Sequence, residues 1–523
     1  MRKKSLWAVT IAAAMALQSV DMVCAEETEM VITLSDEEIQ VDGAAISNDS
    51  SAAVYAGAEL VYYLAGQDAT YGEGDEEDGH TPEEAAEHTV VTITEPGTYR
   101  VTGKISKGQI AIDLGEDSRE DENAVVNLIL DNAEITCTAA SGIVVYNAYE
   151  CGSDDTETAT KDVDTSKAGF NLILADDSIN TVNGSHVAKI YKEGTTQEEV
   201  DAGEAKKAWK FDAAVDSLVS FNIDGEDADN GKLTVNADNE GVSSALHMAI
   251  NGGEIVINSA DDAINASEDY VSVLNINGGI VTCDSGLGSE GDGIDSNGWI
   301  VVNGGYTIAC ANGNSQDSGV DADMGIYLNG GTVLASGNMY DEVSADSAQS
   351  FMVLNFNEKI EEGQLLLLKD SSDAAVTAFS AVNAFQTMVY TCPELAEGDY
   401  TFYKAASVTG DLNGSIYTNI TDYTDAVQLQ YGGSTMMGFG GGRMGFGGTQ
   451  GEMPEDFDPE QMKEAMENGE MPEEMEGREM PEEMPEDFDP GQMKEAMGTG
   501  ESSTVFTVKA GANTFSQISE VTE

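Results

Sequence analysis

The chain has 523 residues, of which 96 are Asp or Glu and 23 are Lys or Arg, so its formal net charge at pH 7 is -73. Repulsion by a charge of this size excludes nucleic acids and anionic membranes as partners. Because 41% of the residues are hydrophobic, the chain can still build a large core, and we expect bound cations to neutralise part of its acidic surface.

The N-terminus has the features of a secretory signal peptide over residues 1–25. Basic residues at 2–4 precede an apolar run at 6–17, and Ala25 lies at a suitable cleavage site. Lipid anchoring at Cys24 is the alternative, but the two residues before it fit a lipoprotein signal poorly. No later segment has the roughly 20 apolar residues of a membrane span. We therefore predict a protein that is secreted, either extracellular or at the cell surface.

Residues 26–88 form an N-terminal region that contains an acidic insertion at 64–86. From residue 89 onward, apolar and polar residues alternate at period two, which is typical of β-strands. Insertions interrupt this alternation up to about residue 235, so the repeat is blurred there. We expect these residues to form strands of the same solenoid as the clearer repeats that follow.

An internal repeat then becomes obvious, because Asn-Gly-Gly occurs four times at intervals of 26 residues, at Asn251, Asn277, Asn303 and Asn329. A short strand-like run lies on each side of the triplet, and a third run opens each unit. Three strands per repeat are typical of a parallel β-helix. The predicted fold is therefore all-β, a right-handed single-stranded parallel β-helix over residues 89–345.

Units stacked at about 4.8 Å would bring equivalent residues together, so the inward positions must form continuous apolar ladders. Three such ladders can be traced, and the first comprises Val242, Ile264, Ile294 and Val320. The same register places Cys283 inward and Cys310 outward. Five cysteines would remain after signal cleavage, an odd number without metal-binding spacing, so we expect unpaired thiols and stability from the core.

The remaining chain divides by composition. Residues 346–432 look like a further β region that caps the repeats, because an open end would expose a sheet edge. Residues 433–502 are rich in Gly, Met, Pro and Glu and are predicted to be a disordered insert. A Met-rich segment that binds a partner or metal is the alternative for this insert. Residues 503–523 return to a terminal strand.

Acidic residues collect at equivalent positions of the repeats. The candidate metal ligands are Asp261, Asp262, Asp292, Asp295, Asp317, Asp321 and Asp323. Stacked carboxylates repel one another, and a cation shared between repeats removes that cost. Because Ca²⁺ binds six to eight oxygens from carboxylates, carbonyls and water, we predict Ca²⁺ as the cofactor. The alternative is that Asp is simply frequent in turns, where its side chain bonds to the backbone.

Sugar rings commonly pack on aromatic faces. The register turns three aromatic residues outward on neighbouring units, and these are the candidate carbohydrate-binding residues Trp299, Tyr306 and Tyr327. The alternative is that they pack beneath the flanking insertions. His247 has no recognisable nucleophile partner and is expected at the surface or in a turn.

With these motifs in view, the chain resembles a family of clostridial-type extracellular carbohydrate-binding proteins, parallel β-helices similar in shape to pectate lyases. The resemblance is carried by the turns at 262–266 and 292–296, by 251–257, and by the Gly- and Met-rich insert before a final strand. It spans most of the chain from about residue 87. Family members bind calcium and plant cell-wall polymers such as cellulose and acidic pectins, which the resemblance implies here. The insertion at 64–86 departs from the family, as does the first clear turn, which lacks Asp.

The predicted function is calcium-dependent binding of plant cell-wall polysaccharide, either acidic pectin or cellulose, without catalysis. Cleavage of a uronate by β-elimination needs a strong base, and no Lys or Arg occurs between Lys232 and Lys359. Hydrolysis needs only paired carboxylates, so a carboxylate-based glycosidase is one alternative. The other is a structural or adhesive surface protein that calcium merely stiffens.

Overall fold

The computed structural model describes residues 29–433 and 500–521. The predicted signal peptide and nearly all of the predicted disordered insert lie outside these ranges. Within them the regular secondary structure is almost entirely β-strand, which confirms the all-β prediction. The helical elements are α1 (Pro82–Ala85), α2 (Gln197–Asp201) and a 3-10 turn (Glu116–Glu120). None of the described helices has the length and apolar character needed to cross a membrane.

The first of three strand ladders contains nine strands. Its members pair in parallel except at the start, where the first two strands are antiparallel. They are β4 (Val54–Ala58), β5 (Thr89–Ile93), β7 (Gly108–Asp113), β9 (Ile143–Asn147), β14 (Ala213–Ser217), β17 (Glu240–Ser244), β20 (Ile264–Ala266), β23 (Ile294–Ser296) and β26 (Val320–Ala322).

The second ladder is parallel throughout and starts from β1 (Met30–Leu34). It continues through β6 (Gly97–Ile105), β8 (Val126–Thr136), β10 (Phe170–Leu174), β15 (Phe221–Gly225), β18 (His247–Ile250), β21 (Val273–Ile276), β24 (Trp299–Val302) and β27 (Gly325–Leu328). The third ladder is also parallel and starts from the end of β8. It continues through β11 (Ile179–Gly184), β16 (Lys232–Ala237), β19 (Glu254–Asn258), β22 (Ile280–Asp284), β25 (Tyr306–Cys310) and β28 (Thr332–Gly337).

The register predicted from the repeat is the register observed. Val242 pairs with Ile264, Ile264 with Ile294, and Ile294 with Val320. All four side chains are buried in one core that all three ladders share. Because side chains alternate along a strand, the residues between these apolar positions point outward.

The Asn-Gly-Gly turns explain the fixed period. Gly279, the last residue of its triplet, has φ +77, which L side chains rarely adopt, and a Cβ there would lie 2.6 Å from the Gly253 carbonyl oxygen. The triplet asparagines form a row of amide hydrogen bonds along the molecule, in which Asn277, for example, donates to the Asn251 oxygen at 2.8 Å. The close approach of the turns requires glycine at the end of each triplet, and the row of hydrogen bonds requires asparagine at its start.

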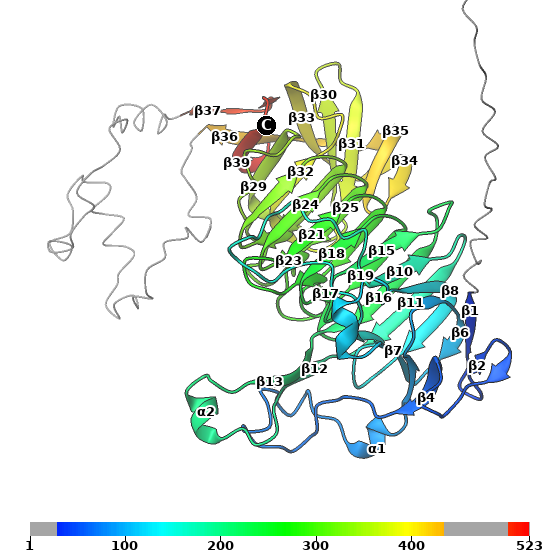
Figure 1. Ribbon diagram of the computed structural model, residues 1–523. Coiled ribbons are helices and arrows are strands. Elements are labelled where there is room, and N and C mark those ends of the chain that lie inside the picture. The colour runs from blue at the N-terminus through cyan, green and yellow to red at the C-terminus, as the bar shows by residue number, and fades with distance from the viewer. Residues whose placement is uncertain (1–28, 434–499, 522–523) are drawn as a thin grey trace, which may run out of the picture.

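Further strands cover one end of the ladders, where β32 pairs with β28, the last strand of the third ladder, and they pair antiparallel except for β29 with β39. Figure 1 shows these strands at the end opposite β1 and β2. They are β29 (Phe351–Ile360), β30 (Leu365–Asp370), β31 (Ala375–Ser380), β32 (Phe385–Thr391), β33 (Gly398–Ala405), β34 (Ser407–Asn413), β35 (Ile416–Thr424), β36 (Val427–Gly433), β37 (Gly500–Ser503), β38 (Phe506–Val508) and β39 (Ala512–Glu520).

Two additions lie at the N-terminal end. β2 (Gln40–Val41) and β3 (Ala44–Ala45) extend β1 as antiparallel strands. An insertion between β11 and β14 forms an antiparallel hairpin of β12 (Val187–Tyr191) and β13 (Lys207–Phe211). The acidic insertion at 64–86 contacts this hairpin, because Lys189 pairs with Glu73 at 2.8 Å.

The cysteines behave as predicted. All five in the described ranges are free thiols. Cys283 is fully buried in the core between the ladders, whereas Cys310 is buried on the outer side against the C-terminal strands. The fold therefore depends on packing and hydrogen bonds in the part of the chain described.

Candidate functional site

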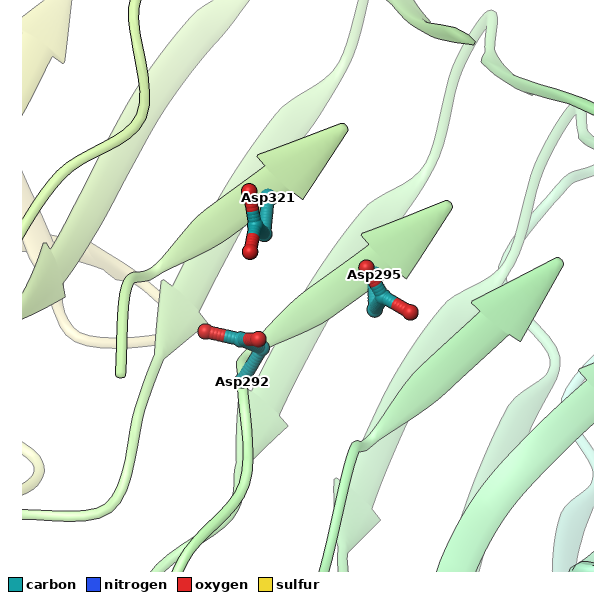
Figure 2. Close-up of side chains that lie close together, drawn as sticks. All are labelled: Asp292, Asp295 and Asp321. Carbon is teal, nitrogen blue, oxygen red and sulfur yellow. The ribbon is translucent and has the colours of Figure 1, made fainter. Parts of the chain in front are cut away.

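Three carboxylates converge on the outer face of the first ladder, as Figure 2 shows. Asp295 lies in β23 and Asp321 in β26, and the two are direct partners in the parallel pairing. Their neighbours in each strand are buried, so the alternation of the strand turns both carboxylates outward. Asp292 precedes β23 and completes the group. One oxygen of each side chain lies within 4.8 Å of the other two.

Backbone groups fix the turns around this cluster. An Asp292 oxygen accepts a hydrogen bond from the Ser318 N–H at 2.6 Å. An Asp262 oxygen accepts from the Asp292 N–H at 2.7 Å, and an Asp317 oxygen accepts from the Gly291 N–H at 2.7 Å. Three of the predicted ligands thus also hold adjacent turns in register, as the alternative explanation for acidic turns requires.

Burial makes these carboxyl groups hard to ionise. Burial raises the pKa of Asp292 to about 8, although the hydrogen bond from the Ser318 N–H has the opposite effect on this pKa. Burial and the adjacent Asp321 raise the pKa of Asp295 to about 7. Burial, together with the charges of Asp295 and Asp261, raises the pKa of Asp262 to about 10. Carboxylates crowded in this way favour either protons or a cation.

The residues present fit calcium. Carboxylates are the hard oxygen donors that Ca²⁺ prefers, and its oxygen ligands lie about 2.3–2.6 Å from the ion. Two ligand oxygens of one ion can therefore be about 5 Å apart, and the three side chains satisfy this limit. Asp292, Asp295 and Asp321 would hold the ion, and Asp262 would contribute negative charge beside it.

The other predicted ligands lie around this centre. The charge of Asp323 acts on Asp295, which places it close to the cluster. Burial and the charge of Glu290 raise the pKa of Asp261. Asp317 accepts a hydrogen bond from Ser315 Oγ in its own turn and another from the Gly291 N–H of the adjacent repeat.

Asp341 is an acidic neighbour of Asp321 that the sequence did not reveal. Burial raises its pKa to about 6, and the charge of Asp321 adds to this effect. One of its oxygens accepts from the Ala322 N–H at 3.2 Å, beyond the last strand of the first ladder. Asp341 follows the final regular repeat, where the 26-residue period no longer predicts a position.

A second acidic group lies farther along the same ladder. Glu240 is buried, one of its oxygens accepts from the Asn265 amide at 2.9 Å, and the other has no hydrogen-bond partner among the described residues. Burial and the charge of Asp212 raise the pKa values of both Glu240 and Asp216 to about 8. Lys210 pairs with Asp212 at 2.6 Å and neutralises part of this group. Asp216 could not be selected from the sequence, because no repeat motif includes it.

The three predicted aromatic residues do not share one surface. Trp299 and Tyr327 lie on the second ladder, beneath a loop whose Ala159 and Val163 pack against them. Lys161 of this loop is 5.1 Å from the Tyr327 ring centre, although no basic residue is near Tyr327 in sequence. Tyr306 lies instead on the third ladder, beside the C-terminal strands. Trp299 is buried, so packing beneath an insertion accounts for it.

The same loop and the asparagine row border a polar cavity of about 440 Å³. Its lining includes Lys161, Asn275, Asn277 and Asn303. Such amides both donate and accept hydrogen bonds. The cavity lies on the second ladder and not beside the carboxylates of the first.

His247 is not at the surface, which corrects the prediction. It is 3% exposed, and its Nδ1 accepts a hydrogen bond from the Val273 N–H at 3.1 Å. Burial lowers the pKa of His247 to about 4, so the ring is neutral. A buried neutral imidazole can satisfy a backbone group, and its position in β18 aligned with Val273 explains the contact.

Comparison with known proteins gives one family. The model of a family described as carbohydrate-binding domain-containing protein matches residues 87–168 and 156–387, which together exceed half of the chain. No curated protein matches. A solved structure described as the polysaccharide lyase-like protein from C. thermocellum, in a gadolinium derivative, matches with 18% identity and a TM-score of 0.32. That match covers 58% of this chain and 94% of the other.

Proposed function

Because the chain belongs to the family of carbohydrate-binding domain-containing proteins, we propose that it is a secreted, calcium-dependent and non-catalytic binder of plant cell-wall polysaccharide. The observation that carries the calcium proposal is the cluster of Asp292, Asp295 and Asp321. Three carboxylates occupy only part of the six to eight oxygen positions around Ca²⁺. The remaining positions can accept oxygens from a ligand.

Acidic pectin is the ligand that this arrangement favours. The surface of the protein is strongly anionic, so a polyuronate cannot approach it unless a cation lies between the two. An ion held by Asp295 and Asp321 on the outer face of the first ladder would bridge protein and uronate carboxylates. Without the ion, like charges would repel the polymer.

We further propose that the three ladders are the walls of a right-handed parallel β-helix. Support comes from the order in which the chain visits them, since β20, β21 and β22 belong to the first, second and third ladders and β23, β24 and β25 repeat that order. Parallel crossover connections are right-handed in nearly all proteins. The shared core lies between the ladders.

A glycosidase is the second candidate, because hydrolysis of a glycosidic bond needs a pair of carboxyl groups and Asp292 and Asp295 lie close together. Asp292 has a pKa raised to about 8 and Asp295 to about 7. Their oxygens, however, lie within 4.8 Å of each other and of Asp321. Inverting enzymes separate their carboxyl groups by roughly 6.5–9.5 Å, and retaining enzymes by about 5–5.5 Å. The grouping of three carboxylates, and not of a pair, favours a shared cation.

Sedimentation with beads that carry covalently coupled pectate tests the proposal, in calcium and in chelator, with released sugar measured in the same samples. We expect the protein to sediment with pectate only when calcium is present, and to release no reducing or unsaturated sugar. Sugar release at enzymatic rates would replace the binding function by the enzyme alternative. Failure to sediment under either condition would favour the structural alternative.

A further inference from the structure

A second groove, of about 600 Å³, lies beside the N-terminal strands of the first ladder. On its floor are Tyr55, Thr92 and Ala111, which are consecutive partners across β4, β5 and β7. The hairpin strand β13 adds Ala208 and Trp209 to its lining. The volume lies within the roughly 300–1,000 Å³ of small-molecule sites.

Trp209 supplies an aromatic surface at this groove. Its ring stacks on the buried Phe211, with centres 5.7 Å apart and an angle of 30° between the planes. Tyr146 packs edge-on against it at 5.6 Å. Despite these contacts, Trp209 is 38% exposed. The indole is therefore fixed from within the protein and accessible from outside, which is the arrangement that a sugar ring needs for stacking.

Polar groups beside the indole are held in place but retain free bonding capacity. Arg119 donates from Nε to the Asn147 side-chain oxygen at 3.0 Å and from one Nη to the Tyr146 carbonyl at 2.8 Å. In the described ranges Arg119 forms no ion pair, so its other N–H groups remain for a ligand. Thr92 is only 5% exposed, and its hydroxyl has no hydrogen-bond partner within the described structure.

The charge of the lining selects among ligands. Glu59, Asp113 and Glu116 outnumber Arg119, the one basic residue of the lining. A uronate would meet this excess of negative charge without a cation to offset it. The hydroxyls of a neutral sugar can both donate to the carboxylates and accept from the guanidinium. The groove therefore favours a neutral glycan.

We propose that this groove binds a neutral pyranose chain, with one ring stacked on Trp209 and hydroxyls bonded to Arg119, Asp113 and Thr92, and that it does so without calcium. The inference rests on the proposed carbohydrate binding and adds a site to it. β-Linked glucose chains are the matching class, because their equatorial hydroxyls leave the ring faces apolar.

The groove and the carboxylate cluster share one face of the first ladder. The outward row that contains Ala111 continues through Val144, Asp216, Ser243 and Asn265 to Asp295. Five strand spacings of about 4.8 Å place the two sites about 24 Å apart. They are therefore separate, and calcium bound at one has no direct contact with the other.

Calorimetric titration of the full chain with cellotetraose in chelator tests this proposal. We expect binding that calcium does not strengthen and that Trp209→Ala weakens about tenfold, a loss of about 1.4 kcal/mol, because the variant removes the stacking surface. Trp209→Phe should retain much of the affinity. Tyr270→Ala, which removes an exposed ring elsewhere, should retain all of it.

The outcomes separate this site from the carboxylate site. Equal affinity of Trp209→Ala and the unchanged protein for cellotetraose would contradict the proposed binding site. So would a loss of cellotetraose binding in chelator. Stronger binding of tetragalacturonate than of cellotetraose in chelator would also contradict it. Pectate sedimentation in calcium should survive Trp209→Ala. If the unchanged protein does not sediment with pectate in calcium but still binds cellotetraose, the proposed calcium-dependent function is wrong and the proposed groove site is supported.

Discussion

At the scale of single residues, the carboxylates of the first ladder are stable only with something positive beside them. Asp292, Asp295 and Asp321 are half-buried and close together, and in the absence of a cation the carboxyl groups of Asp292 and Asp295 favour the protonated form. Folding raises the pKa values of Asp292 and Asp295 above that of an exposed Asp, which is about 3.9. Protonation and metal binding are therefore alternative ways to neutralise this cluster.

The first prediction concerns pH in the presence of chelator. When folding raises the pKa of a carboxyl group, the folded protein is stabilised fully at a pH below the pKa of that group in the unfolded chain. This stabilisation disappears as the pH rises through the pKa of the group in the folded protein, which is about 7 for Asp295 and about 8 for Asp292. Melting temperatures should therefore fall between about pH 5 and about pH 9. Calcium should reduce this fall. The same pH dependence with and without calcium would contradict the prediction.

A second prediction uses the double variant Asp292→Asn and Asp295→Asn. In chelator near pH 8 it should melt higher than the unchanged protein, because two buried charges are gone. In calcium it should gain no stability, whereas the unchanged protein should gain about 2.7 kcal/mol at calcium one hundred times above Kd. The matched control, Asp154→Asn with Asp346→Asn, changes the charge equally at exposed positions and should keep the calcium response.

At the scale of the strands and turns, the repeat is maintained by close approach of one turn to the next. Gly279 and Gly43 have nearly the same φ, +77 and +76, but only Gly279 faces backbone atoms within 4 Å. A side chain at Gly43 meets only the strain of its backbone conformation. A side chain at Gly279 would meet that strain and the Gly253 carbonyl oxygen as well.

The third prediction compares alanine at these two glycines. Gly43→Ala should cost about 1–2 kcal/mol of unfolding free energy, the cost of a left-handed non-glycine residue. Gly279→Ala should cost about 1–3 kcal/mol more, because the stacked turns must separate. Thermal melts of the two variants measure the difference. Equal losses would mean that turn stacking does not set the period.

The elements that obey the repeat were predictable from the sequence, and the additions were not. The apolar row from Val242 to Val320 follows from a fixed spacing, and so does the outward direction of Asp295. Trp209 escaped because it lies in a hairpin without a period, and Trp299 was assigned to an exposed face. A loop more than one hundred residues earlier in the chain covers Trp299, and no local pattern encodes that contact.

At the scale of the whole molecule, one face of the first ladder carries two unlike surfaces. The carboxylate cluster lies toward its C-terminal end, and the groove of Trp209 and Arg119 lies toward its N-terminal end. Plant cell walls contain acidic and neutral polymers side by side. Two sites on one face would let one molecule contact both, and linked binding of this kind strengthens retention without new contacts.

In the proposed function, calcium on the carboxylates of the first ladder is required for binding of acidic polysaccharide. The measurement that tests it most directly is retention on immobilised pectate as calcium is titrated, for the unchanged protein and for Asp292→Asn with Asp295→Asn. We predict saturable retention that rises with calcium for the unchanged protein and is lost in the variant. Equal retention of the two proteins at every calcium concentration, including none, would contradict the account.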